Sequence, residues 1–288
     1  MAASAPSEPV RTTPGSLSLD GRVAVVTGGL GLIGRQLCEG LLEAGGNVVI
    51  ADSDGDACRR RAEELASIYG RPVRGYRVDV TDPGSVTALR EAATAHGGHI
   101  DVLVNSAAVN DVFDDSVTNG DPASSPSRFE NYDLARWQRM LDVNLTGTFL
   151  TCQILGAEMA RRGTGSIINI ASTYGLVAPD QRLYQRPDGT QAFWKSAAYP
   201  ASKGGVIAFS RFLASYWAPQ GVRVNVLSPG GVEDGQDAHF VQNYSARTPL
   251  GRMAQAHEYR GPVVFLAGAG SSYMTGANLV VDGGWTAW

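Results

Sequence analysis

The chain has 288 residues, of which 43% are hydrophobic and 18% are charged, a length that one large α/β domain can fill. Its net charge of −4 disfavours a nucleic-acid-binding surface, because such surfaces usually make a domain basic. No apolar run reaches the roughly 18 residues that a membrane-spanning helix needs. We therefore expect a protein that binds neither nucleic acid nor membrane.

Cysteine and histidine spacing gives no sign of a metal centre. The three cysteines are widely separated without a CxxC pair, and the four histidines form no HxH or HExxH pair. The sequence therefore predicts no disulfide framework and no bound metal, and we expect a cytoplasmic location.

The first nineteen residues differ in composition from the rest. They are rich in Ala, Ser, Pro and Thr, without periodicity and without the apolar core of a secretory signal. We expect residues 1–19 to form a flexible tail before a single domain at 20–288.

From residue 22 onward, short β-branched runs alternate with amphipathic stretches. The runs predict strands at 23–27, 47–51, 73–78, 100–105, 166–171, 222–227 and 278–281. The amphipathic stretches predict helices at 31–44, 54–69, 84–96, 134–162 and 197–217. This alternation predicts an α/β fold, with a doubly wound parallel sheet of about seven strands and helices on both faces.

Two segments interrupt the alternation. Residues 110–131 are polar and contain Gly120, Pro122 and Pro126, and residues 178–196 are too long for an ordinary connection. Since long loops in compact domains are often functional, both are predicted insertions of interest.

A glycine-rich turn, Thr27 to Gly34, follows the first predicted strand. Glycines let the backbone turn sharply and approach a pyrophosphate, which the N-terminus of the next helix can bind. A glycine-rich turn can also serve packing alone. The strand–turn–helix context favours dinucleotide binding.

Asp52 ends the second predicted strand. A carboxylate there can accept hydrogen bonds from the adenosine ribose and would repel a 2′-phosphate, which favours NAD over NADP. The alternative is that Asp52 only caps the following turn. Asp79, after the third strand, is a candidate for contact with the adenine edge.

A second group of residues has acid–base character. Tyr199 and Lys203 are four positions apart on one predicted helix, and Pro200 is tolerated in the first turn. An ammonium beside a phenol lowers the tyrosine pKa from about 10 towards the working range of a general acid–base. Ser172 ends an upstream strand and can orient a substrate oxygen. Asn144, a poor helix former, can hold a water or bend its helix near the lysine.

In this order the motifs resemble those of the short-chain dehydrogenase/reductase family over residues 19–284. They are Leu19-Asp20-Gly21-Arg22, the glycine-rich turn, Asp52, Asp79-Val80, Asn105-Ser106-Ala107-Ala108, Asn144, Ser172, Tyr199 with Lys203, Pro229-Gly230 and Val281-Asp282-Gly283-Gly284. The resemblance implies a Rossmann fold, a nicotinamide cofactor, a homotetramer or homodimer, and a catalytic tetrad of Asn144, Ser172, Tyr199 and Lys203. The cofactor-binding residues that it implies are Gly28, Leu32, Ile33, Gly34, Asp52, Asp79, Val80, Asn105, Ala107, Tyr199, Lys203, Pro229, Gly230 and Val232.

The chain departs from the family pattern at three places. Leu32 stands at the middle glycine of the usual TGxxxGxG turn, so the spacing is similar to that of the longer, nucleotide-sugar branch. Asp234 stands where the family often has a threonine that contacts the carboxamide. Ser172 and Tyr199 are 27 positions apart, about twice the usual gap, so the inserted loop must fold over or beside the active site.

The inserted loop is polar and cationic. Its candidate substrate-binding residues are Gln181, Arg182, Tyr184 and Arg186, which suit a sugar-like or anionic small molecule. The alternative is that the loop packs at a subunit interface. As in relatives, the segment 231–256 is expected to form a substrate lid.

The predicted function is that of an NAD-dependent oxidoreductase that interconverts a secondary alcohol and a ketone. Tyr199 would exchange the proton, Lys203 would lower its pKa and bind the nicotinamide ribose, and Ser172 would orient the substrate. One alternative is an NAD-retaining sugar epimerase or dehydratase, although only seven residues follow Val281 and those enzymes normally have a larger C-terminal domain. The other is a non-catalytic NAD-binding scaffold, which an intact tetrad disfavours.

Overall fold

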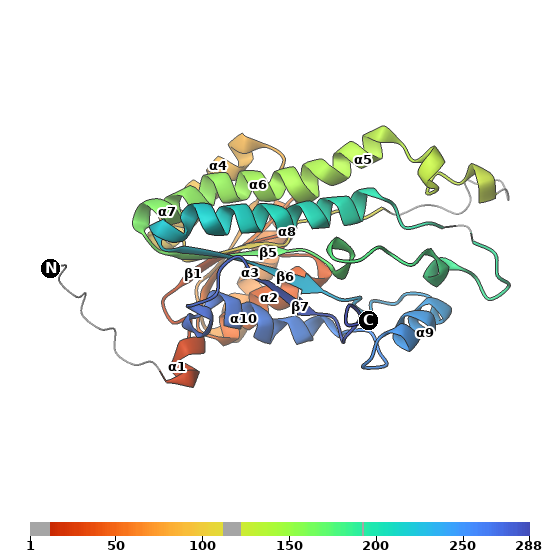
Figure 1. Cartoon of the computed structure of the whole chain (residues 1–288). Coiled ribbons are helices and arrows are strands. Elements are labelled where there is room, and N and C mark those ends of the chain that lie inside the picture. The colour runs from red at the N-terminus through yellow and green to blue at the C-terminus, as the bar shows by residue number, and fades with distance from the viewer. Residues whose placement is uncertain (1–11, 112–121, 192) are drawn as a thin grey trace.

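The computed structural model describes residues 12–111, 122–191 and 193–288 (Figure 1). Seven strands form one sheet with the order β3-β2-β1-β4-β5-β6-β7, and every neighbouring pair is parallel. The strands are β1 (Val23–Thr27), β2 (Asn47–Asp52), β3 (Val73–Arg77), β4 (Val102–Asn105), β5 (Gly165–Ile170), β6 (Val222–Pro229) and β7 (Asn278–Val281). The predicted doubly wound parallel sheet is confirmed.

Helices cover both faces of this sheet (Figure 1). They are α1 (Thr13–Leu17), α2 (Leu32–Glu43), α3 (Gly55–Tyr69), α4 (Pro83–Gly97), α5 (Leu134–Leu141), α6 (Gly147–Thr151), α7 (Ala157–Arg162), α8 (Ala198–Trp217), α9 (Ala238–Arg247) and α10 (Arg260–Ala267). Apolar residues of α2, α3 and α10 pack into one core cluster, and those of α4, α8 and the helix ending in α7 pack into a second.

Strand β1 shows why the predicted strands are continuous apolar runs. All five of its residues are buried. Ala24 and Val26 belong to one core cluster, whereas Val23 and Val25 belong to the other. Since side chains alternate between the faces of a strand, burial on both faces requires an apolar residue at nearly every position.

The predicted tail to residue 19 is wrong at its C-terminal end, and residues 1–11 lie outside the described part. Residues 13–17 form α1, where the Thr12 hydroxyl accepts the N–H of Gly15 (3.3 Å) and Pro14 occupies the first turn. Leu19 is buried in the core, and its N–H donates to the carbonyl of Ala44 (2.8 Å). Capping and apolar burial therefore order this segment despite its composition.

The predicted helix at 134–162 is interrupted in its hydrogen-bond pattern. Two π-helical segments, 142–146 and 152–156, separate α5, α6 and α7 within one continuous helical run. Such local widening is frequent at functional sites, and the first segment contains Asn144.

The glycine-rich turn between β1 and α2 is packed too closely for side chains. Gly28 has a φ of +65°, and a Cβ there would lie 2.6 Å from the backbone of Ala107. A Cβ on Gly34 would lie 2.0 Å from the carbonyl oxygen of Gly28. The first turn of α2 is therefore pressed onto the turn that precedes it.

The change Gly34→Ala should destabilise the fold by about 1–3 kcal/mol, because the added methyl group must displace backbone. Gly261→Ala is the matched control: it also lies in a helix, and its new Cβ would meet nothing within 4 Å. Thermal unfolding followed by circular dichroism measures both variants. Equal melting temperatures would show that the turn can relax around the methyl group.

Candidate active site

Parallel strands bring their carboxyl ends to one edge of the sheet, where ligands usually bind in such folds. In Figure 1 this edge lies at the right, where the 178–196 insertion and α9 also lie. A cavity of about 950 Å³ opens at this edge between the glycine-rich turn and the ends of β2, β3 and β4. It brings together Gly28, Asp52, Asp79, Val80 and Ala107 from the predicted cofactor residues.

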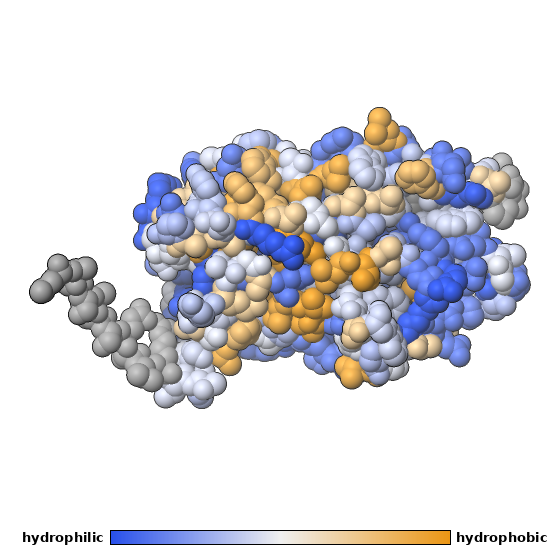
Figure 2. Space-filling view, viewed as in Figure 1, coloured by the Kyte–Doolittle hydropathy of each residue, from blue (hydrophilic) through white to orange (hydrophobic). Residues whose placement is uncertain are grey.

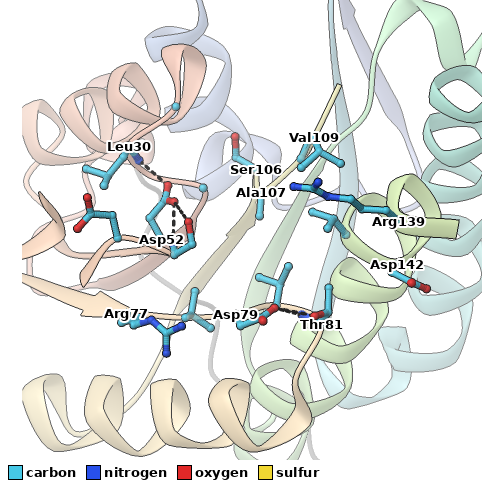
Figure 3. A pocket seen from close by; sticks show the side chains of 18 of the residues that line it. Leu30, Asp52, Arg77, Asp79, Thr81, Ser106, Ala107, Val109, Arg139 and Asp142 are labelled. Atoms are coloured by element: carbon cyan, nitrogen blue, oxygen red, sulfur yellow. Dashed lines mark hydrogen bonds between the residues drawn. The ribbon is translucent and has the colours of Figure 1, made fainter. Parts of the chain in front are cut away.

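Asp52 lies at one end of this cavity (Figure 3). One carboxylate oxygen accepts the N–H of Leu30 (3.1 Å) and the other accepts the N–H of Ser53 (2.8 Å). The carboxylate thus joins β2 to the glycine-rich turn. Arg77, which pairs with Asp52 in the β2–β3 register, lines the same cavity. Sequence reasoning missed Arg77 because the register that brings it to Asp52 is not visible locally.

Asp79 has a local hydrogen-bonding role in addition to lining the cavity. One of its carboxylate oxygens accepts both the N–H (2.9 Å) and the hydroxyl (2.7 Å) of Thr81. These hydrogen bonds hold the pKa of the Asp79 carboxyl below its usual range.

The Asn105 side chain forms hydrogen bonds within the sheet and to the neighbouring helix. Its side-chain amide donates to Asn169 Oδ1 (2.8 Å) and to Cys152 Sγ (3.2 Å), and it is buried. The side chain therefore ties β4 to β5 and to the neighbouring helix. Asn105, one of the implied cofactor residues, therefore stabilises the sheet edge two residues before Ala107.

The remaining implied cofactor residues are not part of the lining of this cavity. Leu32 and Ile33 begin α2. Pro229 ends β6, the N–H of Gly230 donates to Val281 (3.0 Å), and Val232 forms an isolated bridge with Ala254.

The acid–base residues gather at the same edge. Tyr199 and Lys203 occupy the first turns of α8, and Ser172 directly follows the end of β5. Lys203 is buried, its Nζ donates to the carbonyl of Ile170 (2.8 Å), and Nζ lies 5.8 Å from the centre of the Tyr199 ring. Burial lowers the pKa of Lys203 to about 8.

The pKa of Tyr199 differs from the sequence-based expectation. Burial raises it above its usual value, and the hydrogen bond with Ser172 opposes that rise. In the protein alone, desolvation of the phenolate therefore outweighs any lowering by Lys203. The phenol keeps its proton at neutral pH.

Asn144 connects three parts of the site. Its Oδ1 accepts the N–H of Val109 (2.8 Å), and its Nδ2 donates to the Val109 carbonyl (3.0 Å) and to Ser202 Oγ (3.2 Å). The loop after β4 is thereby held against α8. Of the two expected roles, bending of the helix agrees with the π-helical segment in which Asn144 lies.

Comparison with known proteins gives the same answer as this geometry. A family model described as enoyl-(acyl carrier protein) reductase matches residues 31–286. D-threitol dehydrogenase of Mycolicibacterium smegmatis is 36% identical over 93% of this chain and 94% of its own. Galactitol 2-dehydrogenase (L-tagatose-forming) of Cereibacter sphaeroides is 34% identical over 94% of this chain and 97% of its own. This chain belongs to the short-chain dehydrogenase/reductase family.

A solved structure extends the likeness to three dimensions. The crystal structure of a gluconate 5-dehydrogenase from Burkholderia cenocepacia J2315, in complex with NADP and tartrate, is 30% identical with a TM-score of 0.83. The match covers 96% of this chain and 100% of that one. The chain is a short-chain dehydrogenase that acts on CH–OH groups, a family that uses a nicotinamide cofactor.

In this dehydrogenase the insertion packs against the segment predicted as a lid. Leu183 shares an apolar cluster with Tyr244, Met253 and Trp285, and the Tyr184 ring lies 5.5 Å from that of Phe240 on α9. Figure 2 shows a predominantly hydrophilic surface over the insertion, at the right of the view. The insertion and α9 therefore form one unit within the same chain.

The two predicted arginines of the insertion lie on the exposed side. Arg182 forms a two-pronged ion pair with Asp180 (2.8 Å at the shortest), and Arg186 is exposed. Asp180 also pairs with Arg247 of α9. The Asp180–Arg247 ion pair therefore clamps the insertion onto α9, whereas the Arg182–Asp180 pair lies within the insertion.

Gln181 and Lys195 show a further contact that sequence reasoning missed. The Gln181 side chain donates to the carbonyl of Lys195 (3.0 Å) and accepts its N–H (2.8 Å). Lys195 Nζ lies 4.6 Å from the centre of the Tyr199 ring, nearer than Lys203 Nζ. The insertion thus delivers a second ammonium group to the predicted acid–base residue.

Two features are absent from the described part of the chain. Within residues 12–111, 122–191 and 193–288, no helix is long and apolar enough to cross a membrane. Over the same ranges, no three His, Cys, Asp or Glu side chains are grouped as metal ligands would be.

Loss of the Asp180 clamp should loosen the insertion. In Asp180→Asn, trypsin should cut after Arg182 about two- to fivefold faster, because two ion pairs to one partly buried carboxylate are weakened. Asp188→Asn is the control, since Asp188 accepts hydrogen bonds only within its own turn, from Thr190. Cleavage at the same rate in both variants would contradict a clamp.

Proposed function

We propose that this chain is an NAD-dependent dehydrogenase that interconverts a secondary alcohol and a ketone in a polar, hydroxylated small molecule. The observation that carries the proposal is the placement of Tyr199 at the start of α8, with the Nζ of the buried Lys203 5.8 Å from its ring centre and Ser172 acting to lower its pKa. The named relatives that act on threitol and galactitol support a hydroxylated substrate.

The residues present fit a dinucleotide. The cavity of about 950 Å³ is large enough for a dinucleotide. Gly28 packs so closely against the backbone of Ala107 that no side chain fits at this position of the turn. The N-cap of α2, Gly31, lines the cavity and carries no side-chain cap, so backbone N–H groups remain for a pyrophosphate. When bound, the cofactor supplies a hydride acceptor or donor.

Each implied residue has a place in this proposal. Gly28 with Leu32, Ile33 and Gly34 would hold the pyrophosphate at the turn, and Asp52 would hold the adenosine ribose. The adenine, nicotinamide and second ribose would contact the others, namely Asp79, Val80, Asn105, Ala107, Tyr199, Lys203, Pro229, Gly230 and Val232.

The chain's own chemistry is proton transfer. Tyr199 would give its proton to the carbonyl oxygen in reduction and take the hydroxyl proton in oxidation, while Ser172 holds that oxygen. Because burial raises the pKa of Tyr199, the protonated form dominates at neutral pH. Reduction is therefore favoured near neutrality and oxidation at higher pH.

A preference for NAD over NADP follows from the charge at the ribose end of the cavity. Asp52 would repel a 2′-phosphate, whereas Arg77 in the same cavity would attract it. Two backbone N–H groups donate to the Asp52 carboxylate and orient its oxygens at the cavity. This supports a stronger effect of Asp52 than of Arg77 on the choice of cofactor.

The assembly and location are also proposals. Aromatic side chains of α6 and α8 are exposed, among them Phe149, Phe212 and Tyr216. Exposed apolar surface on long helices supports a homotetramer or homodimer. Three buried free cysteines support a reducing, cytoplasmic location.

The cofactor proposal predicts that wild-type kcat/KM is higher with NAD than with NADP. Asp52→Ala should shift the ratio towards NADP by about tenfold or more, because the repulsion ends while Arg77 remains. Asp54→Ala, at the same cavity end but capping α3, is the control. Equal or better use of NADP by the wild type would overturn the proposal.

The catalytic proposal predicts that Tyr199→Phe lowers kcat by at least about 10²-fold, because the proton donor is lost. Binding of NAD should persist, as measured by calorimetry. Tyr174→Phe is the control, since Tyr174 is a buried tyrosine near Tyr199 without an assigned proton-transfer role. A Tyr199→Phe enzyme that keeps most of its activity would rule out this mechanism.

A further inference from the structure

Lysine is used sparingly in this chain. The sequence contains 24 cationic Lys and Arg residues, of which only two, Lys195 and Lys203, are lysines. Their Nζ atoms lie 4.6 Å and 5.8 Å from the centre of the Tyr199 ring. A lysine differs from an arginine in having a compact ammonium whose charge responds to its surroundings. Both lysines therefore lie next to Tyr199, where the properties that distinguish an ammonium from a guanidinium matter.

The backbone of Lys195 is held from two sides. Gln181 commits its side-chain carbonyl to the N–H of Lys195 and its NH₂ group to the carbonyl. The preceding N–H, that of Trp194, donates to Ser127 Oγ (3.0 Å). Since Ser127 belongs to the 110–131 segment and Gln181 to the 178–196 segment, both insertions position this lysine.

The ammonium itself has few partners. Nζ donates to Asn110 Oδ1 (2.5 Å) and lies over the Tyr199 ring within cation–π distance. Within the described ranges, no carboxylate lies within 4.0 Å of it to form an ion pair. Burial lowers the pKa of Lys195 to about 8, and the nearby Asp111 opposes that fall.

Space for a ligand lies beside this ammonium. A cavity of about 380 Å³ is lined by Lys195 and Gln181 together with Trp194, Tyr132 and Pro200. Tyr199 does not line this cavity, but Lys195 does, and its Nζ lies 4.6 Å from the centre of the Tyr199 ring. A substrate that reaches Tyr199 with one end can therefore place another group at Lys195.

We propose that Lys195 binds a carboxylate of the substrate, so that the enzyme prefers a polyhydroxy acid to a neutral polyol. The inference rests on the proposed function and names its substrate class. Among the described residues, this partly buried ammonium donates to one amide oxygen and pairs with no carboxylate, and an anion compensates its charge best. An ammonium has three N–H donors, of which Asn110 takes one.

Lys195 is thus a specificity-determining residue separate from the proton-transfer group. Lys203 differs, because its Nζ is fully buried against the carbonyl of Ile170. Lys195 differs in lining the cavity of about 380 Å³, which makes it the lysine available to a substrate.

Matched pairs of an alditol and its aldonate, threitol with threonate and galactitol with galactonate, test the proposal. The wild type should show the higher kcat/KM with the aldonates. Lys195→Met should lower kcat/KM for aldonates by about tenfold or more, mainly through KM, and change that for alditols by less than about threefold. Arg161→Met removes an exposed charge from the last turn of α7 and should leave both substrate classes unaffected.

Two kinetic results would overturn the proposal. An equal loss on both substrate classes in Lys195→Met would mean that the lysine supports Tyr199 rather than the substrate. An unchanged aldonate preference would mean that the carboxylate binds elsewhere. If the wild type turned over neither class nor any other secondary alcohol, the proposed function itself would be wrong, and the binding measurement below would still judge Lys195.

The two-lysine composition allows a measurement that does not depend on turnover. In protein labelled with ¹³C at the lysine ε-carbons, NMR should show two lysine signals, assigned with Lys195→Arg. Threonate added to the NAD-loaded protein should shift the Lys195 signal and raise its titration midpoint, whereas threitol should not. The same response to both compounds, or to neither, would contradict carboxylate binding.

Discussion

The site depends on holding a phenol and two ammonium groups close together at a buried sheet edge. Each group loses water, and burial opposes the charged form of all three. Such an arrangement is stable only if the surrounding structure supplies hydrogen bonds in fixed positions. The carbonyl of Ile170 does so for Lys203, Asn110 does so for Lys195, and Ser172 does so for Tyr199.

These supports come from distant parts of the chain. Ile170 ends β5, Tyr199 and Lys203 begin α8, and Asn110 follows β4. The parallel register of β4 and β5 sets the positions of Ile170 and Asn110 relative to each other. Asn105 and Asn169 bind each other across that register, so a buried amide pair in the sheet underlies the placement of the site.

Much of the fold was predictable, because burial on both faces leaves an unmistakable apolar run. The bounds of β1 and β7 agree with prediction to the residue, and α2 and α3 agree within one residue at each end. The structure differs from the sequence-based prediction where tertiary contacts override the local composition. Leu19 and α1 lie in a segment of tail-like composition, yet Leu19 fills a place in the core.

The candidate site likewise contains residues that local sequence could predict and residues that depend on tertiary contacts. The sequence alone could name Tyr199, Ser172 and the other two predicted tetrad residues, because their motif is local or follows a strand end. Arg77 was missed because it reaches Asp52 only through pairing of β2 with β3. Lys195 was missed as a site residue because its position depends on Gln181 and on Ser127, which is 67 residues away from Trp194.

The long interval between Ser172 and Tyr199 has a physical consequence in the structure. A short connection could join β5 to α8, but it would lack the segment that brings Lys195 to the Tyr199 ring. The insertion instead leaves β5, packs Leu183 and Tyr184 against the α9 unit, and returns through Lys195 just before α8. The Asp180–Arg247 ion pair lies at the outer surface of the insertion, and Lys195 lies on the segment that leads back to α8. In the proposed enzyme, the added length between Ser172 and Tyr199 therefore forms a wall of the substrate site, and static contacts join that wall to α9.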